Sequence, residues 1–122
     1  LGVEKKLHIL GIISETEKSW YFENCYAFAS ASVSEGFCLP VTEAMSVGKP
    51  LFLSNRTALP EIGGKVAFYF SDFDGNNMQN VFLDGMKEYK TTGLQHEIRK
   101  RGAGFCWNKA AKQYMEVYRS LL

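Results

Sequence analysis

Residues 34–45 read Ser34-Glu35-Gly36-Phe37-Cys38-Leu39-Pro40-Val41-Thr42-Glu43-Ala44-Met45, and the remainder of the chain is expected to act as the scaffold of this stretch. Pro40 favours the first turn of a helix, because its fixed φ is helical and the amide hydrogen that it lacks would have no partner there. Gly48 and Pro50 favour the end of that helix, since glycine can turn left-handed and proline cannot continue the spiral. The stretch therefore predicts a loop that leaves a strand and enters a helix at about residues 40–47.

The start of this helix is suited to binding a phosphate, because unpaired amides and the positive end of the helix dipole meet there. Gly36 allows the backbone to approach a ligand closely. Glu35 lies in the loop, and the side chain of Glu43 tilts back toward the helix start. Carboxylates repel phosphate, so the two are expected to bind hydroxyls of a ribose or a sugar. In the alternative interpretation, Glu43 is a first-turn acid favoured by the dipole and Glu35 is solvated.

Size and composition limit the possible classes of function. The chain has 122 residues, enough for one domain with a real core, and a formal net charge of +1. No general basic field exists, so neither nucleic acid nor an acidic membrane is the indicated partner. No apolar run is long enough to cross a bilayer, the sequence at Leu1 does not match a signal-peptide pattern, and the missing initiator Met suggests an excerpt. Three cysteines without paired spacing favour the reducing cytoplasm.

Short apolar runs alternate with segments of helical pattern along the chain. Strands are predicted at residues 7–10, 26–32, 50–54 and 67–70. Ser14 and Glu17 form a capping box, which predicts a helix that continues toward Asn24. Alternating strands and helices favour parallel crossovers, so the fold class is α/β, a parallel sheet flanked by helices.

Three further helices are predicted after the fourth strand. Two carry apolar residues at helical spacing that are interpreted as core faces: Met78, Val81, Phe82, Met86 and Tyr89 in the first, and Trp107, Ala110, Ala111, Tyr114, Tyr118 and Leu121 in the second. A shorter helix is expected between Thr92 and Arg101 and is ended by Gly102 and Gly104. Its residues Arg99, Lys100 and Arg101 are interpreted as a solvated face.

Other candidate motifs favour structural roles. Asp72-Phe73-Asp74 matches a D-x-D metal-nucleotide pattern, but it is better placed to open the helix after the fourth strand. No metal site is predicted. His8, expected within a strand, and His96, expected on a helix surface, are interpreted as structural, so nucleophilic catalysis lacks a base.

Cys38 stands two residues before the predicted helix start, where amides and the dipole would stabilise a thiolate. The alternative is a small, buried and inert cysteine, and this interpretation is favoured.

The two glutamates are accompanied by further residues of a known pattern: Gly36-Phe37, Leu39-Pro40, Ala44-Met45, Gly48, Pro50 and Ala58-Leu59-Pro60-Glu61. Together they resemble the E-x7-E segment of retaining glycosyltransferases with the GT-B fold, of the large group 1 (family 4) kind. The resemblance extends over nearly the whole chain, from Leu7-His8-Ile9-Leu10-Gly11 to Phe105-Cys106-Trp107-Asn108-Lys109-Ala110-Ala111. Cys38 departs from the glycine expected in many relatives.

In that family, two Rossmann-like domains face each other across a cleft, the C-terminal one holding a nucleotide-sugar and the N-terminal one the acceptor. The resemblance implies that residues 1–122 are the latter part of the donor-binding domain, a partial C-terminal domain of a GT-B fold. It implies a glycosyltransferase of glycan biosynthesis that transfers a sugar from a nucleotide-sugar with retention. Neither a metal nor another cofactor is implied.

The resemblance also assigns roles by position. Glu35 is the catalytic glutamate that contacts hydroxyls of the donor sugar, and Glu43 contacts the ribose hydroxyls. The backbone amides of Gly36, Phe37, Cys38 and Leu39 hold the sugar and the phosphates, and Gly11, Ile12, Ile13 and Ser14 lie along the base.

Some family features are absent from this sequence. Relatives usually clamp the diphosphate with an Arg and a Lys from an earlier part of the domain, and the acceptor domain is missing as well. The chain alone is therefore expected to be catalytically incompetent and at best a weak nucleotide binder. The alternative is a non-catalytic α/β module that binds a nucleotide or a partner. The donor base, the sugar and the acceptor stay open.

Strand order predicts a consequence of this truncation. In the doubly wound order 3-2-1-4-5-6, the four strands would be the third to the sixth, and two strands between the first and the rest would be absent. Residues 7–10 must then pair directly with residues 26–32 or leave that edge bare. A bare apolar edge favours self-association, by strand pairing or by exchange of residues 1–24 between copies.

Overall fold

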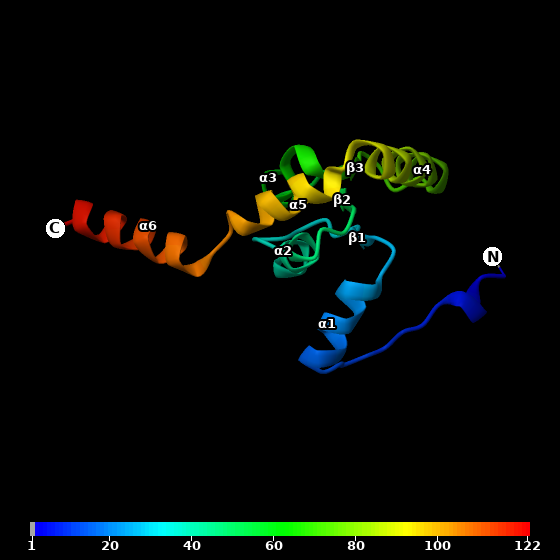
Figure 1. Cartoon of the computed structure of the whole chain (residues 1–122), viewed down its shortest axis with the longest axis horizontal. Coiled ribbons are helices and arrows are strands. Elements are labelled where there is room, and N and C mark those ends of the chain that lie inside the picture. Colours follow the sequence, from blue (N-terminus) through cyan, green and yellow to red (C-terminus); the bar gives the residue numbers. More distant parts are fainter. Residues whose placement is uncertain (1) are drawn as a thin grey trace.

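A three-stranded parallel sheet forms the centre of the structure, a computed structural model that describes residues 2–122 (Figure 1). Its strands are β1 (Phe28–Ser30), β2 (Leu51–Ser54) and β3 (Phe68–Phe70), in the order β1-β2-β3. The helices are α1 (Glu15–Asn24), α2 (Leu39–Ser46), α3 (Leu59–Gly63), α4 (Gly75–Thr92), α5 (Leu94–Ala103) and α6 (Trp107–Ser120), with short 3-10 helices at Glu4–Lys6 and Gly64–Val66. The predicted α/β class with parallel strands is confirmed.

Strand β2 is buried on both faces of the sheet and divides the core in two. Leu51 and Leu53 face the larger cluster, which α2, α3 and α5 supply with Val41, Ala44, Met45, Leu59, Ile62 and Ile98. Phe52 faces the other cluster with Phe70 and with Met86 of α4. Because adjacent residues of a strand point to opposite faces, one short apolar run binds both layers of helices to the sheet.

Local signals place several helix ends as expected. The Ser14 hydroxyl accepts from the Glu17 amide while the Glu17 carboxylate accepts from the Ser14 amide, so the predicted capping box starts α1. Asp74 caps α4 by accepting from two amides, which confirms the structural interpretation of the D-x-D motif. Helix α2 begins one residue before Pro40, and Gly48 has a φ of 70° just after its end.

The predicted strand at residues 7–10 is wrong. These residues form no strand, and Leu7, Ile9 and Leu10 are exposed. β1 pairs with β2 alone among the described residues, so residues 7–10 have no ladder to join, and direct pairing with residues 26–32 does not occur. An apolar run supplies side chains for a strand but cannot supply the neighbouring strand that must satisfy its backbone. His8 therefore lies in this exposed segment and not in a strand.

The core face predicted for the last helix is wrong as well. α6 projects away from the sheet (Figure 1), and Trp107 is 83% exposed and Leu121 78%. By contrast, the stripe of α4 packs on the sheet as predicted. The described residues contain no helix long and apolar enough to cross a membrane.

Helix α5 differs from its prediction in two respects. Gly102 lies inside the helix, where a Cβ would come within 2.7 Å of Met45 Cβ, so the glycine allows close packing on α2. The basic residues are not simply a solvated face, because Arg99 donates to the Val47 carbonyl and Arg101 to the carbonyls of Ile62 and Glu61. Lys100, between them, is exposed.

Candidate functional site

The loop between β1 and α2 lies at the carboxyl edge of the sheet. The Ser54 hydroxyl, at the end of β2, donates to the Ser32 carbonyl, and the Asn55 amide donates to the Phe70 carbonyl at 3.1 Å. These bonds tie together the segments that follow the three strands. In open parallel sheets, ligands bind at this edge.

Glu35 is half-buried in this loop and is held by its backbone. Its amide donates to the hydroxyl of Thr57 at 3.0 Å, and Thr57 itself has a φ of 48° in the segment before α3. Together with burial, the negative charge of the nearby Glu35 carboxylate raises the pKa of the Cys38 thiol. The loop thus presents a partly solvated carboxylate at the edge where α2 begins.

Cys38 immediately precedes α2 with φ and ψ of 70° and 72°, a left-handed conformation that a glycine adopts without strain. Burial raises the pKa of the Cys38 thiol, and the negative charge of Glu35 raises it further. The helix start therefore does not yield a reactive thiolate here. The structure supports the interpretation of Cys38 as an inert residue.

Glu43 lies on the side of α2 that faces α1. Its carboxylate forms an ion pair with Lys18 at 2.8 Å, and Lys18 also contacts Glu15 at 2.7 Å. These contacts raise the pKa of Lys18, that with Glu15 more than that with Glu43. A shallow cavity of about 190 Å³ lies between the two helices, lined in part by Lys18, Phe22 and Glu43.

The structure brings only part of the predicted site together. Glu35, Cys38 and the amides of the loop share the carboxyl edge, and Glu43 lies one turn into α2. Gly11 and Ile12 lie on the exposed segment before α1, where Ile12 is fully exposed, and Ser14 is engaged in capping α1. In Figure 1 this segment runs past the lower end of α1, away from the sheet.

Two residues with a direct effect on the site were missed from the sequence. Thr57 follows β2 as the loop of Glu35 follows β1, and the rule that parallel strands end at one edge could have indicated their proximity. Lys18 could not have been found in this way, because its ion pair depends on how α1 docks on α2. Within residues 2–122, no cluster of His, Cys, Asp and Glu is arranged to hold a metal ion.

Comparison with known proteins assigns this arrangement to a family. A sequence model described as "Glycosyl transferases group 1" matches residues 1–66, more than half of the chain and including both glutamates. The chain belongs to the group 1 glycosyltransferases. The family named from the E-x7-E pattern is thereby confirmed.

Several relatives are mannosyltransferases. The chain is 27% identical over 120 residues to the O-antigen chain mannosyltransferase B of Escherichia coli, covering 94% of this chain and 30% of that protein. It is 29% identical over 124 residues to the MMP alpha-(1->4)-mannosyltransferase of Mycolicibacterium hassiacum, covering 97% of this chain and 30% of that protein. A serotype-specific mannosyltransferase of E. coli, WbdA, is 28% identical over 120 residues, 96% of this chain and 14% of its own length. The chain thus spans less than a third of these relatives.

Proposed function

We propose that residues 1–122 form the latter part of the donor-binding domain of a retaining glycosyltransferase, which transfers a sugar from a nucleotide-sugar to an acceptor. One observation carries the proposal: Glu35 and Glu43 flank the amide-rich start of α2 at the carboxyl edge of the sheet. Amides and a helix dipole favour the diphosphate, and carboxylates favour hydroxyls. A nucleotide-sugar presents both kinds of group.

Each group has a proposed role. Glu35 contacts hydroxyls of the donor sugar at the reacting end, and Glu43 accepts hydrogen bonds from the ribose hydroxyls in exchange for its contact with Lys18. The amides of residues 36–39 bind the sugar and the phosphates and stabilise the leaving diphosphate. Residues 11–14 lie along the base, which requires them to approach α2 more closely than they do in this structure.

The relatives suggest the donor sugar. Three of them are named as mannosyltransferases, so we expect a mannose donor in the parent enzyme. That enzyme needs an acceptor-binding domain and cationic residues for the diphosphate, so the present chain is expected to bind nucleotide weakly and to be inactive alone. Its three cysteines are free, which suits a reducing compartment such as the cytoplasm.

Calorimetric titration with a panel of nucleoside diphosphates tests the proposal. We expect weak binding of at least one of them and none of the corresponding nucleosides, because the phosphates supply the contact with the helix start. Failure of every diphosphate at millimolar concentration would favour a non-catalytic α/β module instead.

We also propose that the chain self-associates through its N-terminal edge. Within residues 2–122, no strand lies beside one edge of β1, and Leu7, Ile9 and Leu10 are exposed in the segment before α1. Unpaired strand edges next to apolar residues favour pairing with another chain. Light scattering should show dimers that dissociate after Ile9→Lys. A strict monomer at high concentration, with residues 7–10 protected from hydrogen exchange, would show pairing within one chain.

A further inference from the structure

Phe105 contacts the loop of residues 31–38 between β1 and α2, the donor loop, from a distant part of the chain. It lies in the turn between α5 and α6, and its ring meets that of Phe37 edge-to-face, with centroids 5.7 Å apart and planes at 79°. Phe37 follows Gly36 directly in the loop that carries Glu35. Edge-to-face pairs of this geometry are attractive beyond the area that they bury.

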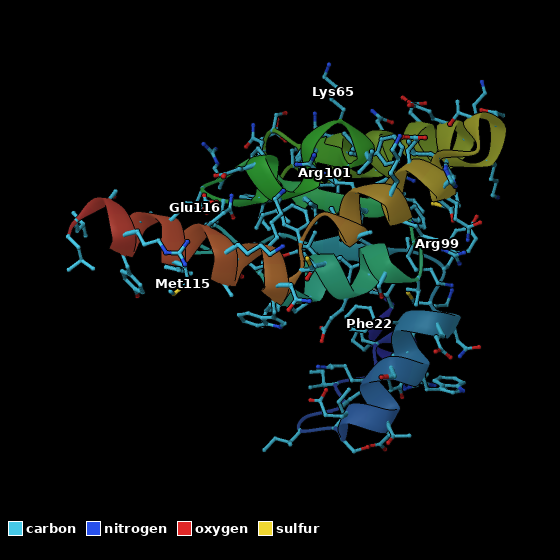
Figure 2. All side chains as sticks on the ribbon, turned by 60° about the vertical axis from the view of Figure 1, so that its left-hand side comes forward. Phe22, Lys65, Arg99, Arg101, Met115 and Glu116 are labelled. Carbon is cyan, nitrogen blue, oxygen red and sulfur yellow. The ribbon has the colours of Figure 1, made fainter. Side chains whose placement is uncertain are left out.

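Phe105 is in turn supported by Arg101. The guanidinium lies 5.7 Å from the ring centroid of Phe105, a cation–π distance, and donates to the carbonyls of Ile62 at 2.6 Å and Glu61 at 2.5 Å. Figure 2 labels Arg101 where α5 lies beside α3. A Cβ at Gly64 would come within 2.5 Å of Arg101 Cζ, so this position has room for the guanidinium because it lacks a side chain.

The donor loop requires such support because Gly36 gives its backbone more freedom than any other residue type would. Among the described residues, no heavy atom outside residues 35–37 lies within 4 Å of the place where a Cβ of Gly36 would be. On one side of Gly36, the amide of Glu35 is fixed by Thr57, and on the other side the ring of Phe37 is fixed by Phe105. The two contacts hold the flexible residue from both sides.

We propose that Phe105, supported by Arg101, is a positioning residue that holds the amides of residues 36–38 in the geometry needed for the donor. This inference rests on the proposed donor site. It assigns to the turn between α5 and α6 a role in nucleotide-sugar binding, although that turn contributes neither a charged group nor an amide to the ligand.

Hydrogen exchange of the present chain tests, without any ligand, whether the contact of Phe105 with Phe37 holds the loop in place. Phe105→Ala should accelerate exchange of the Glu35 amide, which donates to Thr57 in the same loop, by about 2- to 12-fold, the factor that corresponds to loss of one aromatic pair. Phe105→Tyr keeps the ring and should restore the slow rate. Phe73→Ala, which removes another exposed phenylalanine, is the matched control. Amides of α4 report whether each variant remains folded.

Titration with the nucleoside diphosphate and the nucleotide-sugar separates the two proposals. The positioning role predicts that Phe105→Ala both accelerates loop exchange and lowers nucleotide-sugar affinity by a similar factor. It predicts neither change in Phe73→Ala. Unchanged loop exchange in Phe105→Ala would show that the contact between Phe105 and Phe37 does not hold the loop, whatever the chain binds. Faster exchange with unchanged affinity overturns the positioning role while the donor site stands. If the unaltered chain binds no nucleotide, the proposed function fails, and the positioning role fails with it.

Discussion

Helices α4 and α6 carry apolar residues at the same helical spacing, but only one of them is covered. The stripe of α4 packs on β3 and on the central strand, with Met86 6% exposed. The stripe of α6 lies clear of the sheet, with Met115 50% exposed on the same helix (Figure 2). Periodicity therefore identifies the face that a helix would bury, whereas the presence of a partner depends on the remainder of the fold.

The methionines give the largest expected difference between the two helices. Met86→Ala should lower the free energy of unfolding by about 2–5 kcal/mol, because it leaves a cavity beside Phe52 and Phe70. Met115→Ala should stay within about 0.5 kcal/mol of the unaltered chain, since its side chain is half in water. Urea denaturation measures both. Equal losses would mean that α6 is packed in solution.

A smaller difference in the free energy of unfolding is expected between substitutions of Tyr89 in α4 and Tyr118 in α6. The Tyr89 hydroxyl donates to the Gly48 carbonyl at 2.8 Å, which connects α4 to the end of α2. Tyr89→Phe should cost about 0.5–1.5 kcal/mol, whereas Tyr118→Phe on the exposed face of α6 should cost almost nothing. A cost that was the same for both would contradict the assignment of α4 as the docked helix. The same denaturation experiment serves both variants.

Burial also raises the pKa of Tyr89, which gives the comparison a pH dependence. A raised phenol pKa means that the folded state retains the proton longer than the unfolded state. This contribution to stability is complete below the ordinary pKa near 10 and is lost as the pH rises through the higher folded value. Tyr89→Phe should therefore flatten the alkaline loss of stability.

The smallest expected difference is in the alkylation rates of the two cysteines that precede α2 and α6. Burial and Glu35 raise the pKa of Cys38, whereas Cys106 is exposed just before α6. Alkylation at pH 8 should label Cys106 several-fold faster than Cys38, and the rate at Cys38 should continue to rise at higher pH. Preferential labelling of Cys38, slowed by nucleotide, would restore the activated-thiolate interpretation.

Signals within a few residues predicted much of this fold. The capping box of Ser14, the cap of Asp74 and the start of α2 at Pro40 lie where the sequence places them, because each depends on neighbouring atoms alone. The strand at residues 7–10 and the core face of α6 were wrong because neither segment meets, among residues 2–122, the neighbouring strand or helix surface that it needs.

The candidate site divides in the same way. Glu35 and the amides of residues 36–39 were predicted from the local pattern of a loop that enters a helix. Thr57, Lys18 and Phe105 act on that loop or on Glu43 across long sequence separations. The shared edge of parallel strands could have indicated Thr57, but no spacing in the sequence indicates Lys18 or Phe105. The predicted position of residues 11–14 along the base depended on a strand at residues 7–10, which the structure does not form.

The division of roles between the two glutamates is the central claim, and binding measurements on their variants test it directly. Glu43→Ala should weaken nucleoside diphosphate binding by about 1.5–3 kcal/mol, the range for hydrogen bonds to a charged group. Lys18→Met, which breaks the ion pair of Glu43 but keeps its carboxylate, should not weaken it. Glu35→Ala should spare the free nucleotide and reduce nucleotide-sugar binding, with loss of turnover in the full-length enzyme. Equal losses for both ligands in both glutamate variants would contradict the account.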